Sequence, residues 1–245
     1  MKKLQLPIFL QEPETLAIFK DIAAAVPKGT KFYIVGGAMR NAMFYYYFKK
    51  KLPQRDYDSL IVGDHKKFIT NLRKRGFVYG KIRRKTQAVL KKAKFKNAKT
   101  LNDFVFLDMH WVKKVDIVQN MKDHASFTIN GFAIEVRDLF SSNWRKKVVE
   151  MPNAIRDLRR KQLVVNAVDN KHNLFAAMRF MSVGFKQPGK SDVDWLVREF
   201  AKSHKKRRKR NLEKLYNYVG GKKKAEKLAK KIGIDLKKLI ALNAS

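Results

Sequence analysis

The sequence predicts a mixed α/β (α+β) head, followed by an all-helical neck and a basic helical C-terminal region. Two observations lead to this prediction. In the first 140 residues, short apolar runs rich in β-branched and aromatic residues alternate with segments of helical periodicity. Beyond residue 140 the apolar residues recur mainly at helical spacing. A chain of 245 residues with 45% hydrophobic content is long enough for a core and for one or two domains.

The first half of the chain supplies five elements in order. Residues 12–26 place apolar side chains at helical spacing, and "KFYIV" (31–35) has the character of a buried strand. A helix is expected in "AMRNAMFYYYFKK" (38–50), directly after two glycines. "DYDSLIV" (56–62) is the next expected strand, and "HKKFITNLRKRG" (65–76) fits a helix that stops at glycine.

Later elements complete the pattern. "DFVFLDMHWVKKVDIVQ" (103–119) predicts a hairpin of two β-rich runs that turns near 108–114. "PNAIRDLRRKQL" (152–163) and "NLFAAMRFMSVGF" (173–185) are helices or helix ends. The tail from about residue 190 holds 18 Lys/Arg and 6 Asp/Glu, yet it keeps an apolar stripe. We therefore expect a basic helical module there rather than a disordered arm.

The charge is strongly positive. Lysine and arginine total 56 against 21 aspartates and glutamates, a formal net charge of +35. Such a field concentrates polyanions, so the expected partner is nucleic acid bound mainly through its phosphates. An anionic membrane is the alternative, but no apolar run approaches the roughly 20 residues that span a bilayer. We expect RNA as a partner and no membrane.

Cysteine is absent, which excludes disulfides, thiolate zinc sites and a cysteine nucleophile. The start, "MKKLQLPIFLQEPE", has a basic tip, but its apolar patch is too short for a secretory signal and lacks a small-residue cleavage pattern. We expect an intracellular protein, cytoplasmic or nucleoid-associated, with an organellar location left open.

Two glycines, Gly36 and Gly37, stand where a predicted strand passes into a helix. Glycine lets the backbone turn tightly and approach a ligand, and the free N–H groups of a new helix bind anions. Arg40 falls in the first turn of that helix and could reach the same anion. A Gly-Gly pair alone is more often an ordinary turn, but this combination suits a triphosphate.

Two aspartates, Asp56 and Asp58, are separated by one residue on a predicted strand, so both carboxylates project from one face. Like charges side by side repel, and the pair makes sense if Mg²⁺ ions bridge it. Two ions can activate an attacking hydroxyl and stabilise a leaving pyrophosphate. Such sites often take a third carboxylate from a neighbouring strand. Asp116 is the first candidate, and Asp108 is the second.

Four ordered segments carry a resemblance. They are "VGGAMRN", "RDYDSLIV", "HASFTINGFAI", and the stretch that joins "NAIRDLRRKQLVV" to "DNKHNLFAAMRFMSVGF". In this order they resemble the motifs of the class II nucleotidyltransferases of the polymerase-β superfamily. That family comprises the bacterial-type tRNA CCA-adding enzymes and the related bacterial poly(A) polymerases. The matches span roughly residues 33–186.

The resemblance implies a polymerase-β-type nucleotidyltransferase head at 1–140, a helical neck with a nucleotide-recognition segment at 141–190 and a short basic RNA-binding tail at 191–245. It implies template-independent transfer of NMP from ATP, CTP or both to an RNA 3′ end, with tRNA one candidate. Two Mg²⁺ ions would be held by the catalytic residues Asp56, Asp58 and Asp116. The nucleotide would be held by Gly36, Gly37, Arg40, Asn130, Asn170, Asn173 and Arg179.

The chain departs from the family at several of its motifs. The family's aspartate after G-G-A-x-R is Asn41, and its Arg-Arg-Asp before F-T-I-N is "HAS" at 124–126. The Asp and Arg that read the base edge in the family correspond to Asn170 and Asn173. An amide donates and accepts hydrogen bonds but lacks the charged fork of arginine. These changes predict relaxed or purine-biased nucleotide selection.

Some of the candidate residues have simpler explanations. Arg179 is equally consistent with helix packing, and Asn130 could be a helix-end hydrogen-bonding group. The aromatic run "FYYYF" (44–48) is helix packing or a surface on which unpaired bases stack. Residues 81–99 hold nine basic residues and no acidic one, and "HKKRRKR" spans 204–210. The residues expected to bind RNA are Arg83, Arg84, Lys85, Lys205, Lys206, Arg207, Arg208, Lys209 and Arg210.

Two functions remain in competition. The intact Gly-Gly pair and the acidic residues favour an active RNA 3′-terminal nucleotidyltransferase. The charge, the missing arginines and the altered base-reading pair favour a catalytically inactive protein of the same fold that binds RNA in a larger ribonucleoprotein particle with protein partners. A scaffold in a phosphate-rich setting gains nothing from a repulsive aspartate pair, so the sequence favours the enzyme.

Overall fold

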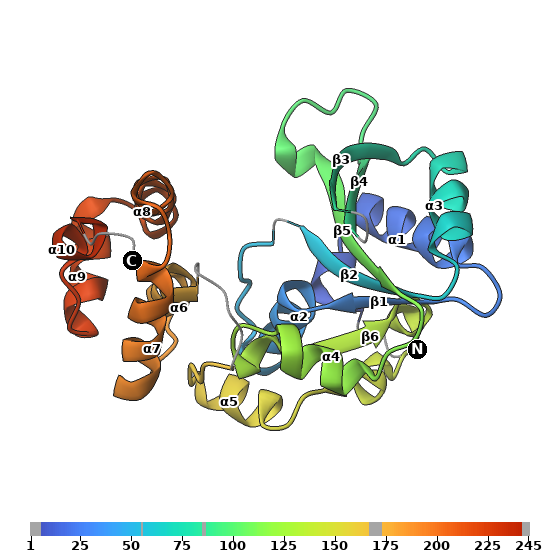
Figure 1. Ribbon diagram of the computed structural model, residues 1–245. Helices are drawn as coiled ribbons and strands as arrows, with labels where there is room; N and C mark the ends of the chain where they lie inside the picture. The colour runs from blue at the N-terminus through green and yellow to red at the C-terminus, as the bar shows by residue number, and fades with distance from the viewer. Residues whose placement is uncertain (1–5, 55, 85–86, 167–172, 242–245) are drawn as a thin grey trace. The chain divides into compact units, whose positions relative to one another are not determined.

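The computed structural model describes residues 6–54, 56–84, 87–166 and 173–241, without the side chains of residues 81–84. The chain divides into two compact units (Figure 1). One combines Met1–Met121 with Asn130–Pro152, and the other combines Lys122–Ile129 with Asn153–Ser245. The division of the chain at residues 140 and 190 stays a prediction.

The first unit is built on a seven-stranded sheet in the order β3-β4-β5-β2-β1-β6-β7. Strands β2 and β5 run parallel, and the other neighbouring pairs are antiparallel. The prediction of a mixed α/β head is therefore confirmed. The strands are β1 (Lys31–Val35), β2 (Tyr57–Val62), β3 (Val78–Arg84), β4 (Gln87–Ala93), β5 (Phe104–Val112), β6 (Phe132–Glu135) and β7 (Val149–Glu150).

Helices pack on one face of this sheet through aromatic contacts. Phe19 lies 4.9 Å from the ring of Tyr57 on β2, and Phe68 lies 4.8 Å from the ring of Phe32 on β1. Because side chains alternate along a strand, Asp58 is on the opposite face. The helices of this region are α1 (Pro13–Ala25), α2 (Gly37–Phe48), α3 (His65–Lys74), α4 (Ile117–His124) and the short η1 (Ile8–Leu10), η2 (Leu101–Asp103), η3 (Thr128–Asn130), η4 (Val136–Phe140) and η5 (Trp144–Lys147).

The hairpin predicted for residues 103–119 is wrong. Residues 104–112 form the single strand β5, and the apolar run that follows Asp116 is the helix α4. The Asp116 carboxylate accepts hydrogen bonds from the backbone N–H groups of Val118 and Gln119, 2.8 and 3.1 Å long. An aspartate that accepts from N–H groups two and three residues ahead caps a helix, and this local contact overrides the β propensity of the segment.

The second unit is helical, as the sequence predicts. Phe175 and Phe200 pack at 4.6 Å between ring centroids, and the Thr128 hydroxyl donates to the buried Asp157 carboxylate at 2.8 Å. None of the helices in the described part of the chain has the length and apolar character needed to cross a bilayer. The helices of this unit are α5 (Ala154–Arg160), α6 (Asn173–Ser182), α7 (Lys190–Ala201), α8 (Lys205–Val219), α9 (Lys222–Lys231) and α10 (Leu236–Ala241).

Candidate functional site

The Gly-Gly turn brings the start of α2 against the aspartate pair. Gly36 ends the β1–α2 connection with φ 64° and ψ −123°, a conformation that essentially only glycine adopts. Its N–H donates to the Phe132 carbonyl on β6 at 3.0 Å. A Cβ added at Gly36 would lie 3.5 Å from Oδ2 of Asp58. The turn therefore places backbone from the first helical turn of α2 beside a carboxylate on β2.

Arg40 is held over this turn by two asparagines. Its Nη1 donates to Oδ1 of Asn130 at 2.6 Å, and its Nε and Nη2 donate to Oδ1 of Asn41 at 3.1 and 2.9 Å. A Cβ added at Gly37 would lie 3.6 Å from Nη2 of Arg40. The structure thus brings together Gly36, Gly37, Arg40 and Asn130, with a cation at a helix N-terminus, where an anion is favoured.

Asn41 connects the turn to the loop before the aspartates. Its side chain is 3% exposed, and its Nδ2 donates to the Pro53 carbonyl at 3.1 Å and to Oε1 of Gln54 at 2.9 Å. The Gln54 amide in turn donates to the backbone carbonyl of Asp56. An aspartate at position 41 could accept from Arg40 but could not donate to these two oxygens. Sequence reasoning missed this role, because both partners lie on a loop more than ten residues away.

The aspartate pair lies at the start of β2, with Asp56 just before the strand and Asp58 within it. Asp56 and Asp58 are exposed, whereas Tyr57 and Ser59 are buried, so the two carboxylates share one face. In the parallel pairing of β2 with β5, Asp58 lies directly opposite Asp108. Opposite residues project from the same face of a sheet. Asp108 therefore belongs to the same face.

The two candidates for a third acidic residue lie in different settings. Asp116 was expected on a strand beside the pair, but it is exposed and caps α4. Asp108 is 7% exposed and accepts a 2.8 Å hydrogen bond from the side-chain amide of Gln87. The signal for Asp108 was the alternation of "FLDMH", but its register against β2 is a long-range property.

The donor set at this face consists of oxygens. In the described residues no three or more histidine, aspartate or glutamate side chains are grouped closely enough to hold a metal ion by themselves. Mg²⁺ in phosphate chemistry is usually bound by one or two carboxylates together with substrate phosphates and water. Asp56 and Asp58 fit that mode, in which the nucleotide supplies the remaining ligands.

The predicted nucleotide-recognition residues of the second unit are less accessible. Asn170 lies outside the described residues. Asn173 begins α6 and is 2% exposed, and its Nδ2 has no hydrogen-bond partner within the described part of the chain. Its burial does not suit the prediction that it contacts a base. Arg179 is partly buried, and its guanidinium lies 5.3 Å from the ring centroid of Tyr218 on α8, so it packs between helices.

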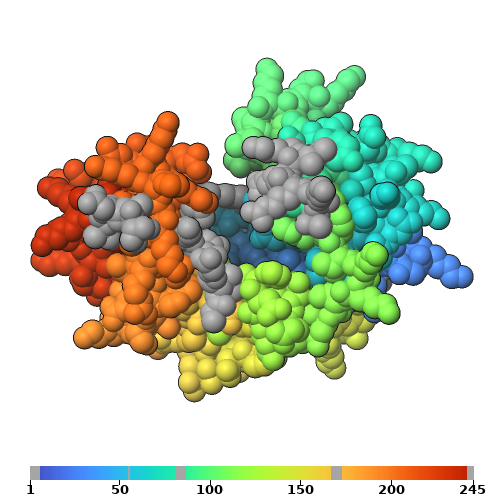
Figure 2. Space-filling view, viewed as in Figure 1, coloured from blue at the N-terminus to red at the C-terminus, as the bar shows by residue number. Residues whose placement is uncertain are grey.

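The basic run at the start of α8 is exposed except at one position. Lys205, Lys206, Arg207, Lys209 and Arg210 are all exposed. The C-terminal helices of the second unit, which include α8, are drawn in orange to red in Figure 2.

The exception is Arg208, whose side chain is 0% exposed. Its Nη1 donates to the carbonyls of Ala201 and Ser203 at 2.8 and 2.6 Å. The prediction that Arg208 binds RNA is therefore wrong, because the residue ties the turn before α8. The signal was present in the sequence: Arg208, Asn211 and Leu215 follow the helical spacing of the buried face.

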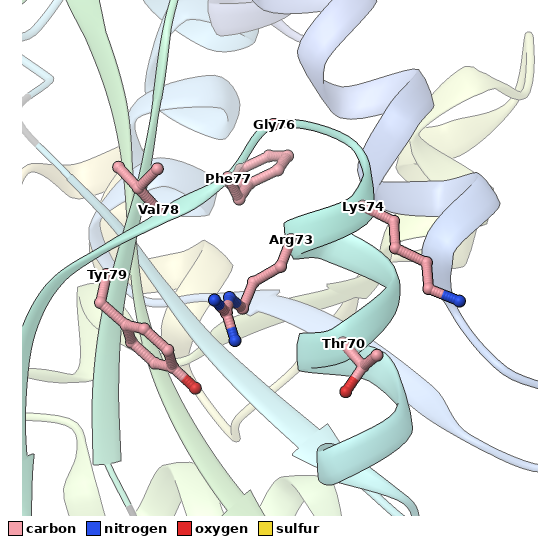
Figure 3. Close-up of a pocket in the computed structure, with 7 residues that line it drawn as sticks. All are labelled: Thr70, Arg73, Lys74, Gly76, Phe77, Val78 and Tyr79. Carbon is pink, nitrogen blue, oxygen red and sulfur yellow. The ribbon is translucent and has the colours of Figure 1, made fainter.

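The other predicted basic segment, residues 81–99, covers the end of β3 and all of β4, which form a hairpin at the border of the sheet. Arg83 and Arg84 end β3, but their side chains and Lys85 lie outside the described part. Next to this hairpin, a hollow of about 490 Å³ is lined by residues of α3 and β3. Figure 3 shows Arg73 pointing toward Tyr79 within it, with the guanidinium 5.6 Å from the ring centroid. Basic and aromatic side chains are therefore exposed together here.

The first unit thus combines a glycine turn, an anchored arginine and carboxylates on one sheet face. No protein-family model matches the sequence, and no curated protein matches it. Solved structures do match, among them CCA-adding enzymes and a tRNA nucleotidyltransferase.

The Thermotoga maritima CCA-adding enzyme complexed with tRNA matches at 17% identity and a TM-score of 0.65, over 90% of this chain and 51% of that one. A CCA-adding enzyme with CTP matches at 19% identity and a TM-score of 0.64, over 91% and 52%. A tRNA nucleotidyltransferase with a primer tRNA and an incoming ATP analogue matches at 19% and 0.57, over 87% and 58%. The likeness shows a shared fold, and this chain spans little more than half the length of those proteins.

Proposed function

We propose that the protein is a template-independent RNA 3′-terminal nucleotidyltransferase that transfers NMP from ATP, CTP or both. The observation that carries the proposal is the position of Gly36 against Asp58, with Asp108 opposite Asp58 on the next strand. A pocket that only bound RNA would gain nothing from carboxylates at a site built for anions. Their presence beside an arginine and a helix N-terminus fits a triphosphate that arrives with its cations.

In this proposal positively charged and N–H groups bind the triphosphate, and carboxylates bind the metal ions. The N–H groups at the start of α2 and the guanidinium of Arg40 bind the triphosphate, and the asparagines at 41 and 130 fix the guanidinium. Asp56 and Asp58 hold Mg²⁺, with Asp108 in place of Asp116 as the third carboxylate. Two bound Mg²⁺ ions would lower the pKa of the attacking 3′ hydroxyl and would stabilise the negative charge of the leaving pyrophosphate.

The exposed lysines and arginines of α8 and the basic border of the sheet would hold the RNA backbone. The 3′ end of an RNA is the proposed partner, and tRNA is the first class to test, because the fold neighbours include complexes with tRNA. A three-part organisation with a head, a neck and a basic tail, and an intracellular location, belong to the same proposal.

One observation favours the second function, a catalytically inactive RNA-binding protein. Asn173 stands where the family has a base-reading arginine, and it is buried. A protein that does not select a nucleotide has no need of an exposed side chain at this position, whereas an enzyme would need other residues to contact the incoming base.

The two functions are separated by one assay. The full chain is incubated with Mg²⁺, a short labelled RNA and each NTP in turn, and the products are resolved at single-nucleotide length. We expect extension with ATP or CTP that disappears with EDTA and in Asp58→Asn. Tight RNA binding without extension by any NTP would refute the enzyme and support the scaffold.

A further inference from the structure

A second hollow lies in the first unit, where the parallel strands β2 and β5 both begin. Its volume is about 610 Å³, within the range of sites that bind small organic groups. The walls come from η1, the loop after α2, the first residue of β2, the loop after β4 and the start of β5. Asn41 of α2, which holds the Arg40 guanidinium, also lines it, but the residues assigned above to bind the phosphates or Mg²⁺ directly do not.

The walls combine a flat apolar side with amides. Phe104 is partly exposed, and Lys91 on β4 places its Nζ 4.7 Å from the centroid of that ring. Leu101 lines the same hollow and is 77% exposed, although it is large and apolar. Asn102 adds a side-chain amide with a donor and an acceptor, whereas the amide of Gln54 is already bonded to Asn41 and to the backbone of Asp56. An aromatic face beside amide donors and acceptors matches a nucleobase, which offers a π face and a hydrogen-bonding edge.

The charges around the hollow favour a phosphate at its rim. Glu12 is its acidic residue, and its carboxylate lies 2.8 Å from Nζ of Lys94. Burial alone would raise the pKa of Glu12, but the hydrogen bonds from Lys94 and Thr15 outweigh burial and lower the pKa below its ordinary value. Glu12 therefore stays ionised at neutral pH and balances Lys94. Lys51, which is exposed, leaves the rim positive.

One wall of the hollow leads along β5 to a carboxylate, while Tyr57 and Val105 in its other walls lie on the opposite face of the sheet. Phe104, Phe106 and Asp108 alternate along one face of β5, and the two rings lie 6.0 Å apart. Two residues along a strand span roughly 7 Å, so Phe106 is one such step from Asp108. On the other side, Gln54 lines the hollow and donates to the backbone of Asp56. Phe104 is therefore four residues, roughly 13 Å, from Asp108 along β5, a distance that a short single strand of RNA can span.

We propose that the hollow at the start of β2 and β5 binds an unpaired base near the 3′ end of a single-stranded RNA. The base stacks on Phe104, and the adjoining phosphate faces Lys51. The inference rests on the proposed function for its account of which end of the RNA lies nearest Asp58. It commits to RNA, because the chain carries a net charge of +35 and the wall offers an aromatic ring under a cation.

The test is a binding cycle on the full chain, read by fluorescence anisotropy. The RNAs are short unstructured oligonucleotides in which each of the last four bases is removed in turn. The variant is Phe104→Leu, which keeps an apolar side chain but removes the ring. The matched control is Phe95→Leu, because Phe95 is 46% exposed on the adjoining loop and does not line the hollow.

We expect the unmodified protein to lose about tenfold in affinity when one particular base is missing, since stacking of a base on an aromatic ring is worth roughly five- to 150-fold. Phe104→Leu should bind the intact RNA about tenfold more weakly and lose nothing further at that position. Phe95→Leu should behave like the unmodified protein. Equal losses in Phe104→Leu and the unmodified protein at every position would overturn the proposal.

Two further measurements guard the conclusion. If Phe104→Leu is too unstable to assay, the fluorescent base 2-aminopurine is placed at each terminal position of the RNA in turn. Quenching of its fluorescence at one position, in the unmodified protein and in Phe104→Tyr, supports base binding in the hollow. Equal fluorescence at all positions refutes it. Displacement of the quenched RNA by millimolar ATP alone would make the hollow a mononucleotide site and also refute it. Because these readouts measure binding, a positive cycle in a protein that transfers no nucleotide would overturn only the proposed function.

Discussion

The burial of Arg208 allows a sharp prediction, because a neighbour of the same type is exposed. Arg208→Met keeps a long unbranched side chain and removes the guanidinium. Arg210→Met makes the same chemical change on the solvent side of α8. If the structure is right, the first variant loses stability and the second loses only affinity for RNA.

The magnitude follows from the two hydrogen bonds to the carbonyls of Ala201 and Ser203. A hydrogen bond from a charged group contributes about 1.5–3 kcal/mol, so the pair sets an upper limit of about 6 kcal/mol. The variant also no longer has to bury a charged group, which offsets several kcal/mol of that loss of stability. The methionine side chain preserves most of the packing. We expect a net loss of about 2–3 kcal/mol for Arg208→Met, and less than about 0.5 kcal/mol for Arg210→Met.

Urea unfolding followed by far-UV circular dichroism measures both variants. With a slope of about 2 kcal/mol per molar urea, Arg208→Met should unfold about 1 M earlier. Its affinity for RNA, measured well below the transition, should be unchanged, whereas Arg210→Met should bind more weakly. An Arg208→Met protein as stable as the unmodified chain, with reduced RNA affinity, would show that Arg208 faces the solvent.

Three other outcomes are expected from the same structure. Asp58→Ala should abolish nucleotide transfer and leave the urea midpoint unchanged or raised, because it removes one of two like charges; transfer at the normal rate would rule out a catalytic role. Gly36→Ala should lower the stability of the first unit by about 1–3 kcal/mol, because alanine is strained at the positive φ of this position. The new Cβ would add no clash, since it would lie at an ordinary 3.5 Å from Asp58. A melting temperature equal to that of the unmodified chain would contradict the positive φ. Replacing Lys205, Lys206 and Lys209 by glutamine should lower the log–log salt slope of single-stranded RNA binding by about 0.7 for each phosphate that the protein no longer neutralises, and an unchanged slope would exclude the start of α8 as the RNA-binding surface.

The sequence predicted the parts of the site that are local. A strand, two glycines, a helix and a strand with Asp56 and Asp58 lie within about thirty residues, and each is indicated by its composition and spacing. Their order alone indicates a turn that faces a carboxylate pair. Local rules sufficed because the β1–α2–β2 unit is contiguous in the chain.

The third carboxylate of the proposed site depends on a strand pairing that residue spacing does not encode. Asp108 lies opposite Asp58 because β5 pairs with β2 in parallel across about fifty residues of intervening chain. Asp116 had the better sequence context, but its carboxylate satisfies the backbone of α4 instead. The bridge from Asn41 to the 53–54 loop was equally beyond reach, since it closes only when that loop folds back on α2.

The borders of the sheet affect how readily copies of this chain pair strand to strand. A border strand exposes unpaired backbone groups that can recruit another chain and start aggregation. Here β7 has only two residues, and β3 is broken by register shifts between Tyr79 and Lys81 and between Ile82 and Arg84. Neither border offers a long, regular template. Copies of this chain brought close together therefore lack a continuous ladder at either described border, which disfavours aggregation by strand pairing.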